Sequence, residues 1–147
     1  MKTFLLLGLG RLGSKLAKEL SETGHEVMVV DRNEDRVNRV MPYVTSAKIG
    51  NAVDPDLLAS LGVSNFDACF VTMHTDFQNS LEATYQLKEL GAKMVVSRAE
   101  SDTHEKFLLK NGADRVIYPE KQVAKWTAIK YISEDIGSFM ELDGEHC

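Results

Sequence analysis

Residues 5–13 read Leu-Leu-Leu-Gly-Leu-Gly-Arg-Leu-Gly, an apolar run that leads directly into the pattern Gly-x-Gly-x-x-Gly. The pattern alone is a weak signal, because glycine-rich turns are common, but here it follows a predicted strand and opens a predicted helix. We expect Gly8 to make a tight turn, Gly10 to let the backbone approach a pyrophosphate, and Gly13 to let the helix pack against the strand. The helix would present free N–H groups at its start, so the stretch predicts a phosphate-binding turn.

Asp31 closes the next apolar run and is the second part of the signal. It lies near the roughly 20-residue interval beyond the glycines at which an acidic side chain accepts hydrogen bonds from ribose hydroxyls. A carboxylate here repels a 2′-phosphate, which favours NAD, ATP, ADP or AMP over NADP, although Arg32 directly after it leaves the opposite preference open. The other interpretation of Asp31 is a solvated carboxylate at a strand end. We predict an adenine nucleotide as the ligand.

Three further residues are candidates for contact with that nucleotide. Arg11 stands between the second and third glycines, where a guanidinium suits an additional phosphate; the alternative is an exposed arginine at the start of a helix. Asn51 and Ala52 follow the third predicted strand, where the edge of an adenine would lie. The Asn51 amide can serve either the adenine or the local turn, and the residues leave both possibilities open.

Short apolar or β-branched runs alternate along the chain with segments of helical periodicity. Four glycines, at 24, 62, 91 and 112, fall just past helical segments, where a left-handed residue ends a helix. Nearly continuous apolar strands are typical of a parallel sheet covered by helices on both faces. We predict a Rossmann-like, doubly wound α/β fold with six parallel strands in the order 3-2-1-4-5-6, and a site at the carboxyl ends of strands one and four. The predicted strands are 3–7, 26–30, 47–49, 68–73, 93–97 and 115–118.

A last segment with roughly helical periodicity follows Pro119, at 121–136. Its apolar residues recur at helical spacing and need a covering surface, which is either the chain's own sheet or a second subunit. The predicted organisation is a nucleotide-binding domain at 1–119, then a crossover helix and tail at 120–147. The stripe comprises Val123, Trp126, Ile129, Ile132 and Ile136.

Composition excludes several classes of function. The 147 residues are 44% hydrophobic and 27% charged, with a net charge of −5 and no block of Lys or Arg, so we do not expect a nucleic-acid partner. Cys69 and Cys147 have no metal-ligand or redox spacing around them, which favours a reduced, cytoplasmic setting. No run approaches the roughly 20 apolar residues of a membrane span.

An enzyme is not the favoured interpretation. The short segment after the sixth predicted strand leaves no room for the substrate domain of a dehydrogenase. His74 and Asp76, just beyond the fourth predicted strand, are the best acid–base pair that the chain offers. The alternative that stays open is the cofactor domain of an NAD-dependent oxidoreductase.

The chain resembles the N-terminal RCK domain of the regulatory subunits of bacterial Trk and Ktr potassium-uptake systems. The resemblance covers nearly the whole sequence, and its last motif is far more specific than the glycines. The motifs that carry it are Gly8-Leu9-Gly10-Arg11-Leu12-Gly13, Val30-Asp31-Arg32-Asn33-Glu34, Gly50-Asn51-Ala52, Asn65-Phe66-Asp67 and Gly112-Ala113-Asp114-Arg115-Val116-Ile117-Tyr118-Pro119-Glu120.

The resemblance implies a non-catalytic domain that senses ATP and ADP or NAD(H) and gates an integral-membrane potassium-translocating subunit. It implies a homo-oligomer, as a dimer or an octameric ring, that is cytoplasmic and peripheral to the inner face of the membrane. Members usually continue into a C-terminal lobe, which is absent from this sequence. The nucleotide-contacting residues that it implies are Gly8, Leu9, Gly10, Arg11, Leu12, Gly13, Asp31, Arg32, Asn51, Ala52, Met73, His74 and Arg98.

The resemblance also implies roles for three charged residues. Arg11 would reach the terminal phosphate of an ATP held by a neighbouring subunit, and Arg98 would face the phosphates. Glu120 would lie near a divalent cation, Mg²⁺ or Ca²⁺, at the dimer interface. His74 departs from the family pattern, because many relatives have a small or acidic residue there.

Overall fold

The computed structural model describes residues 1–73 and 77–132. Packing divides the chain into two units, Met1–Ile117 and Tyr118–Cys147.

The first unit is built on one sheet of six parallel strands in the order β3-β2-β1-β4-β5-β6, which confirms the predicted topology. Strands β4 and β6 end earlier than the sequence predicted, at Val71 and Ile117, and β5 begins later, at Val95. The residues beyond these bounds do not continue the ladder to a neighbouring strand. The strands are β1 (Thr3–Leu7), β2 (Glu26–Asp31), β3 (Ser46–Ile49), β4 (Ala68–Val71), β5 (Val95–Arg98) and β6 (Arg115–Ile117).

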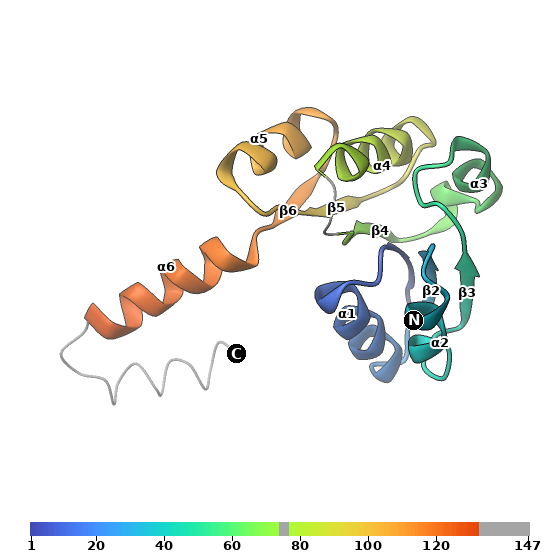
Figure 1. Ribbon diagram of the computed structural model, residues 1–147, viewed down its shortest axis with the longest axis horizontal. Helices are drawn as coiled ribbons and strands as arrows, with labels where there is room; N and C mark the ends of the chain where they lie inside the picture. Colours follow the sequence, from blue (N-terminus) through green and yellow to red (C-terminus); the bar gives the residue numbers. More distant parts are fainter. Residues whose placement is uncertain (74–76, 133–147) are drawn as a thin grey trace. The chain divides into compact units, whose positions relative to one another are not determined.

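Helices cover both faces of this sheet. Figure 1 shows α1 and α2 on one face and α3, α4 and α5 on the other, as the right-handed crossover rule requires when the strand order reverses at β1. The carboxyl ends of β1 and β4 diverge toward helices on opposite faces, which opens a crevice there. The helices are α1 (Arg11–Glu22), α2 (Glu34–Val40), α3 (Pro55–Ser60), the short 3-10 helix η1 (Val63–Asn65), α4 (Phe77–Glu89) and α5 (Asp102–Lys110).

The core consists of one apolar layer on each side of the sheet. Successive side chains of a strand point to opposite faces, so Leu5 and Leu7 of β1 pack into one layer while Leu6 packs into the other. The Leu5 layer lies under α3, η1 and α4, and includes Cys69. Burial raises the pKa of the Cys69 thiol to about 12, so this cysteine is an inert core residue.

Helix starts and ends follow the local chemistry of the sequence. The side chains of Asp54 and Ser101 accept hydrogen bonds from the N–H groups of Asp56 and His104, and thereby cap α3 and α5. The predicted glycines at 24, 62, 91 and 112 all have positive φ, as does Gly8. These positions permit left-handed turns that other residues adopt only with strain.

The second unit contains α6 (Pro119–Ile132). The helix begins two residues before the predicted segment, because Pro119 supplies the fixed φ that suits a first helical position. Residues 133–147, which include Ile136 and Cys147, lie outside the described part of the chain. Within the described residues, no helix is both long enough and apolar enough to cross a membrane.

Candidate nucleotide site

The glycine loop is held against two strands by close backbone packing. The Gly8 N–H donates to the carbonyl oxygen of Val30 at 2.9 Å, and the Thr72 hydroxyl donates to the Gly8 carbonyl at 2.7 Å. A Cβ on Gly8 would lie 2.5 Å from the backbone nitrogen of Met73. A Cβ on Gly13 would collide with the Gly8 carbonyl and lie 2.7 Å from the Thr72 hydroxyl. Both glycines therefore allow the start of α1 to sit directly on β1 and β4.

Asp31 lies at the end of β2 and is only 6% exposed. Its Oδ2 accepts a hydrogen bond from the Leu9 N–H at 2.7 Å, and its Oδ1 accepts one from the Asn33 N–H at 2.8 Å. The Arg36 Nη1 lies 3.9 Å from Oδ2 and balances the buried charge. Because a carboxylate oxygen can accept more than one hydrogen bond, Asp31 can brace the loop and still accept bonds from a ligand.

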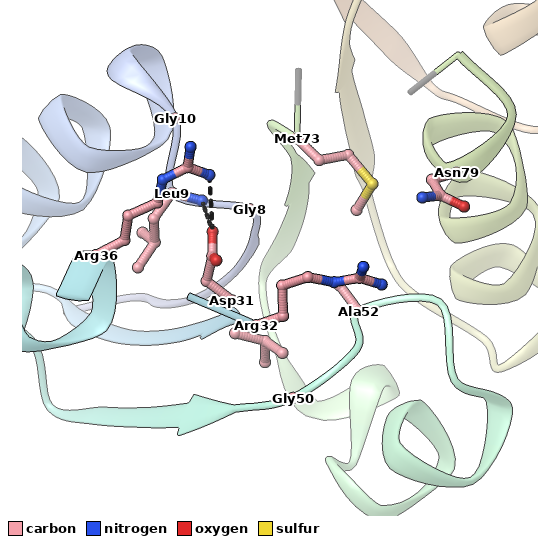
Figure 2. Close-up of a pocket in the computed structure, with 11 residues that line it drawn as sticks. Gly8, Leu9, Gly10, Asp31, Arg32, Arg36, Gly50, Ala52, Met73 and Asn79 are labelled. Atoms are coloured by element: carbon pink, nitrogen blue, oxygen red, sulfur yellow. Dashed lines mark hydrogen bonds and ion pairs between the residues drawn. The ribbon is translucent and has the colours of Figure 1, made fainter. Parts of the chain in front are cut away.

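These groups line a pocket of about 130 Å³ at the carboxyl ends of the strands. Figure 2 shows the glycine loop and Arg36 on one side, Met73 and Asn79 on the other, and Arg32 between them. The volume is below the roughly 300–1,000 Å³ of an enclosed ligand pocket, so it suits part of a nucleotide rather than the whole. The lining residues are Gly8, Leu9, Gly10, Val30, Asp31, Arg32, Arg36, Gly50, Ala52, Met73 and Asn79.

Seven of the residues expected from the sequence line this pocket together. They are Gly8, Leu9, Gly10, Asp31, Arg32, Ala52 and Met73. Four lining residues were not among the predicted contacts. Val30 and Gly50 belong to motifs that the sequence analysis quoted, whereas Arg36 and Asn79 lie inside helices without a motif of their own.

Other expected residues lie beside the pocket wall rather than in it. Arg11 is exposed at the first position of α1, followed by Leu12, and Gly13 is buried beneath the loop. The Asn51 Oδ1 accepts a hydrogen bond from the Val53 N–H at 3.1 Å, so this oxygen serves the local turn. His74 and Asp76 are outside the described residues.

Arg98 ends β5, at the same edge of the sheet as the pocket. Its Nη1 lies 3.1 Å from the Glu100 carboxylate. Its Nε is buried and has no hydrogen-bond partner in the described part of the chain. A buried unpaired donor is costly, so this guanidinium retains capacity to bind an acceptor.

The expected cation residue, Glu120, lies in the first turn of α6, in the second unit. Among residues 1–73 and 77–132, no three His, Cys, Asp or Glu side chains gather as metal ligands would.

The fold and the pocket define the class of Rossmann-type domains with a glycine loop at the switch point of the sheet. The sequence model of the TrkA-N domain family matches residues 4–119, so the chain belongs to the TrkA-N family. The chain is 41% identical over 145 residues to Ktr system potassium uptake protein C of Bacillus subtilis, and 39% identical over 145 residues to protein A of that system. These alignments cover 99% of this chain but 66% and 65% of the two relatives, so the chain spans about two-thirds of their length.

Solved structures share the fold. The TrkA-N domain of the inner membrane protein ybaL from Escherichia coli superposes with a TM-score of 0.78 at 20% identity, covering 90% of this chain and 97% of that one. The GsuK channel bound to NAD and GsuK bound to ADP superpose with TM-scores of 0.68 and 0.67, both at 18% identity. Those two matches cover 79% of this chain, and 21% and 31% of the GsuK chains.

Proposed function

We propose that this chain is a nucleotide-sensing regulatory domain of a potassium-uptake system. The observation that carries the proposal is the pocket itself, in which a glycine loop and the buried Asp31 carboxylate converge at the carboxyl ends of β1 and β2. Membership of the TrkA-N family and the similarity to Ktr uptake proteins support the link to potassium transport.

The ligand that we propose is an adenine nucleotide with a free ribose. The loop N–H groups and the start of α1 would hold the phosphates, and Asp31 would accept hydrogen bonds from the ribose hydroxyls. The structures of GsuK with NAD and with ADP support the same ligand class, since they share this fold. Arg32 and Arg36 flank the carboxylate and would offset part of its repulsion of a 2′-phosphate.

Discrimination between ATP and ADP requires contacts to the terminal phosphate alone, because the two ligands share every other group. Arg11 is exposed at the start of α1 and is not part of the pocket wall, which suits a guanidinium that acts on a nucleotide in a neighbouring subunit. A Mg²⁺ or Ca²⁺ ion at Glu120 would add a second charge-dependent contact. Couplings of about 1–3 kcal/mol are typical between linked sites and would shift a gate several-fold or more.

The proposed assembly is a homo-oligomer, as a dimer or an octameric ring, on the cytoplasmic side of an integral-membrane potassium-translocating subunit. The exposed apolar side chains of α6 support self-association, because contact with a second copy would remove them from water. In this assembly the domain binds nucleotide without turning it over.

A thermal-unfolding screen against ATP, ADP, AMP, NAD, NADH and NADPH tests the proposed ligand class. A ligand at about 100 times its Kd stabilises the native state by about 2.7 kcal/mol, which raises the melting temperature by several degrees. We expect stabilisation by one or more of the adenine nucleotides and less by NADPH. No shift with any nucleotide would contradict the proposal, and nicotinamide-dependent reduction of a substrate would favour the oxidoreductase alternative.

The substitution Arg11→Ala tests whether Arg11 distinguishes ATP from ADP while the glycine loop and Asp31 bind the groups that both nucleotides share. We expect it to weaken ATP binding by about tenfold and to leave ADP binding within about twofold, since the loss of a charge-assisted contact to one phosphate is of that size. Isothermal titration calorimetry with both nucleotides measures the difference. Lys15→Ala, which removes an exposed cation one turn further along α1, is the matched control. Equal loss of ATP and ADP binding in Arg11→Ala would show that the discrimination has another source.

A further inference from the structure

Asn79 supplies a polar side chain to the wall of the pocket that faces the glycine loop. It lies in the first turn of α4 and is half-buried, and Figure 2 shows it together with Met73 on the side opposite the loop. The preceding Gln78 is exposed and the following Ser80 is buried. Of these three described neighbours on the helix, Asn79 alone lines the pocket.

The order of groups along a nucleotide places the base at this wall. The loop N–H groups would hold the phosphates and Asp31 would hold the ribose hydroxyls, as in the proposed function. The base is bonded to the ribose at the end remote from the 5′-phosphates. Figure 2 shows Ala52, Asn79 and the thioether of Met73 across the pocket from Gly10, where that end of the ribose would point.

The chemistry of this wall suits a flat heterocycle with polar groups on its edge. Ala52 and Met73 offer small or apolar contacts, and both pack against the apolar layer of the core. Among the lining residues that the structure describes, Asn79 is the only one whose side chain can both donate and accept a hydrogen bond. A carboxamide has two N–H donors and two oxygen lone pairs, so Asn79 can bond to a ligand in addition to its contacts within the protein.

The two segments that carry this wall are joined to each other. The Gln86 amide of α4 donates to the Val53 carbonyl at 3.0 Å, so the loop that presents Ala52 is tied to the helix that presents Asn79. The Asn51 Oδ1 accepts from the Val53 N–H at 3.1 Å and holds the same loop in its turn. A wall that is fixed before the ligand arrives lowers the ordering cost of binding.

We propose that Asn79 is the residue that selects adenine, through hydrogen bonds from its carboxamide to the edge of the base. Adenine carries its 6-amino donor beside a ring acceptor, N1 on one side and N7 on the other, and a carboxamide offers the complementary acceptor and donor. Guanine has an acceptor at position 6, and beside it lies either a second acceptor, N7, or an N–H followed by a 2-amino donor. One carboxamide therefore leaves a polar group of either guanine edge unpaired. The inference rests on the proposed nucleotide function and adds the residue that recognises the base.

Calorimetric titration of the full chain with ADP and with GDP measures this selection, because the two ligands differ only in the base. We expect the unaltered protein to bind ADP at least about tenfold more tightly than GDP, which is within the range for a bidentate base contact. Asn79→Ala should weaken ADP binding by about fivefold or more and GDP binding by less than about twofold. Asn79→Asp replaces the donor by a second acceptor, which repels N1 or N7 of adenine and suits the adjacent donors of guanine. It should therefore lower the preference for ADP further than Asn79→Ala does.

The ratio of the Kd values for GDP and ADP decides the outcome. A residue that only stabilised α4 or bound the phosphates would change both Kd values by the same factor. An unchanged ratio in Asn79→Ala would thus overturn the proposal, as would equal affinity of the unaltered protein for ADP and GDP. If Asn79→Ala does not fold, Asn79→Asp, which has nearly the same size, decides by the same ratio. Absence of ADP binding in the unaltered protein would instead contradict the proposed function, so the two failures are distinguishable.

Gln78→Ala is the matched control. It removes an amide side chain from the preceding position of α4, where the amide is exposed and donates to the Glu82 carboxylate at 2.9 Å. Both Kd values should stay within about twofold of those of the unaltered protein. A change in the ratio as large as that in Asn79→Ala would show that selection of the base does not depend on the Asn79 contact, and would overturn the proposal.

Discussion

Asp31 both stabilises the glycine loop and lines the pocket. Its carboxylate holds the glycine loop through the Leu9 N–H and the following turn through the Asn33 N–H, and it also lines the pocket. A nucleotide would therefore meet an acceptor whose position is already fixed, which reduces the ordering cost of binding. The residue pattern predicted the ribose contact, whereas the bond to the loop depends on how closely β1 and β2 approach.

The close packing of the glycine loop leaves no room for a side chain at Gly13. We predict that Gly13→Ala destabilises the protein by about 1–3 kcal/mol or more, because the added Cβ would meet the Gly8 carbonyl and the Thr72 hydroxyl, and neither can move freely. Chemical denaturation at neutral pH measures the free energy of unfolding.

Gly24→Asn is the control for this substitution. A Cβ at Gly24 meets no atom within 4 Å, and asparagine tolerates the left-handed backbone there, so the loss should stay below about 1 kcal/mol. Equal destabilisation by the two substitutions would contradict the proposed packing role of Gly13.

At the scale of elements, two aspartates join neighbouring strands at the edge opposite the pocket. Asp67 precedes β4 and accepts from the Thr3 N–H of β1 at 2.8 Å. Asp114 precedes β6 and accepts from the Val95 N–H of β5 at 2.7 Å and from the Lys88 ammonium at 2.8 Å. The bond from Thr3 lowers the pKa of Asp67. Asp67 and Asp114, which belong to two of the family motifs, thus join neighbouring strands.

We predict that Asp114→Asn lowers stability by about 1 kcal/mol at pH 7, since it weakens the bonds to β5 and α4 at a partly exposed site. Burial alone would raise the pKa of Asp114, but the bonds from Lys88 and the Val95 N–H outweigh it and lower the pKa. A lowered pKa contributes stability above the unfolded value, near 4, that is lost as the pH falls through the folded value. The difference between the proteins should therefore shrink below about pH 4.

Urea denaturation at pH 7 and at pH 3 checks this pH dependence. Glu22→Gln is the control, because the Lys18–Glu22 pair is exposed and 3.9 Å apart, and should change stability by less than about 0.5 kcal/mol. A constant difference between Asp114→Asn and the unaltered protein at both pH values would show that the ionised carboxylate contributes nothing.

The sequence predicted the helices and strands better than the side chains that line the pocket. Local signals were sufficient to place the strands and the left-handed glycines, because periodicity and helix ends depend on a few neighbouring residues. The strand order followed from these elements and the right-handed crossover rule. The pocket residues Arg36 and Asn79 come from helices whose placement depends on tertiary packing. No pattern within one helix reports which side chain will face a distant loop.

At the scale of the whole molecule, the exposed apolar side chains of α6 predict self-association. We expect the chain to sediment as a dimer or larger assembly, and Trp126→Glu to shift it toward monomer, because a charge in an apolar contact is strongly unfavourable. Ala124→Glu adds the same charge about 200° around the helix and serves as the control. Analytical ultracentrifugation that finds the unaltered chain monomeric, or Trp126→Glu equally associated, would contradict this expectation.

An adenine nucleotide is proposed to bind where the glycine loop meets Asp31. Titration of ¹⁵N-labelled protein with ADP, followed by NMR, measures this binding residue by residue. We expect saturable shifts of the Leu9 and Gly10 amide signals, while those of Glu26 and Ser46, at the opposite edge of the sheet, stay in place. Unchanged loop signals at saturating ADP, ATP and NAD, or shifts confined to the opposite edge, would contradict it.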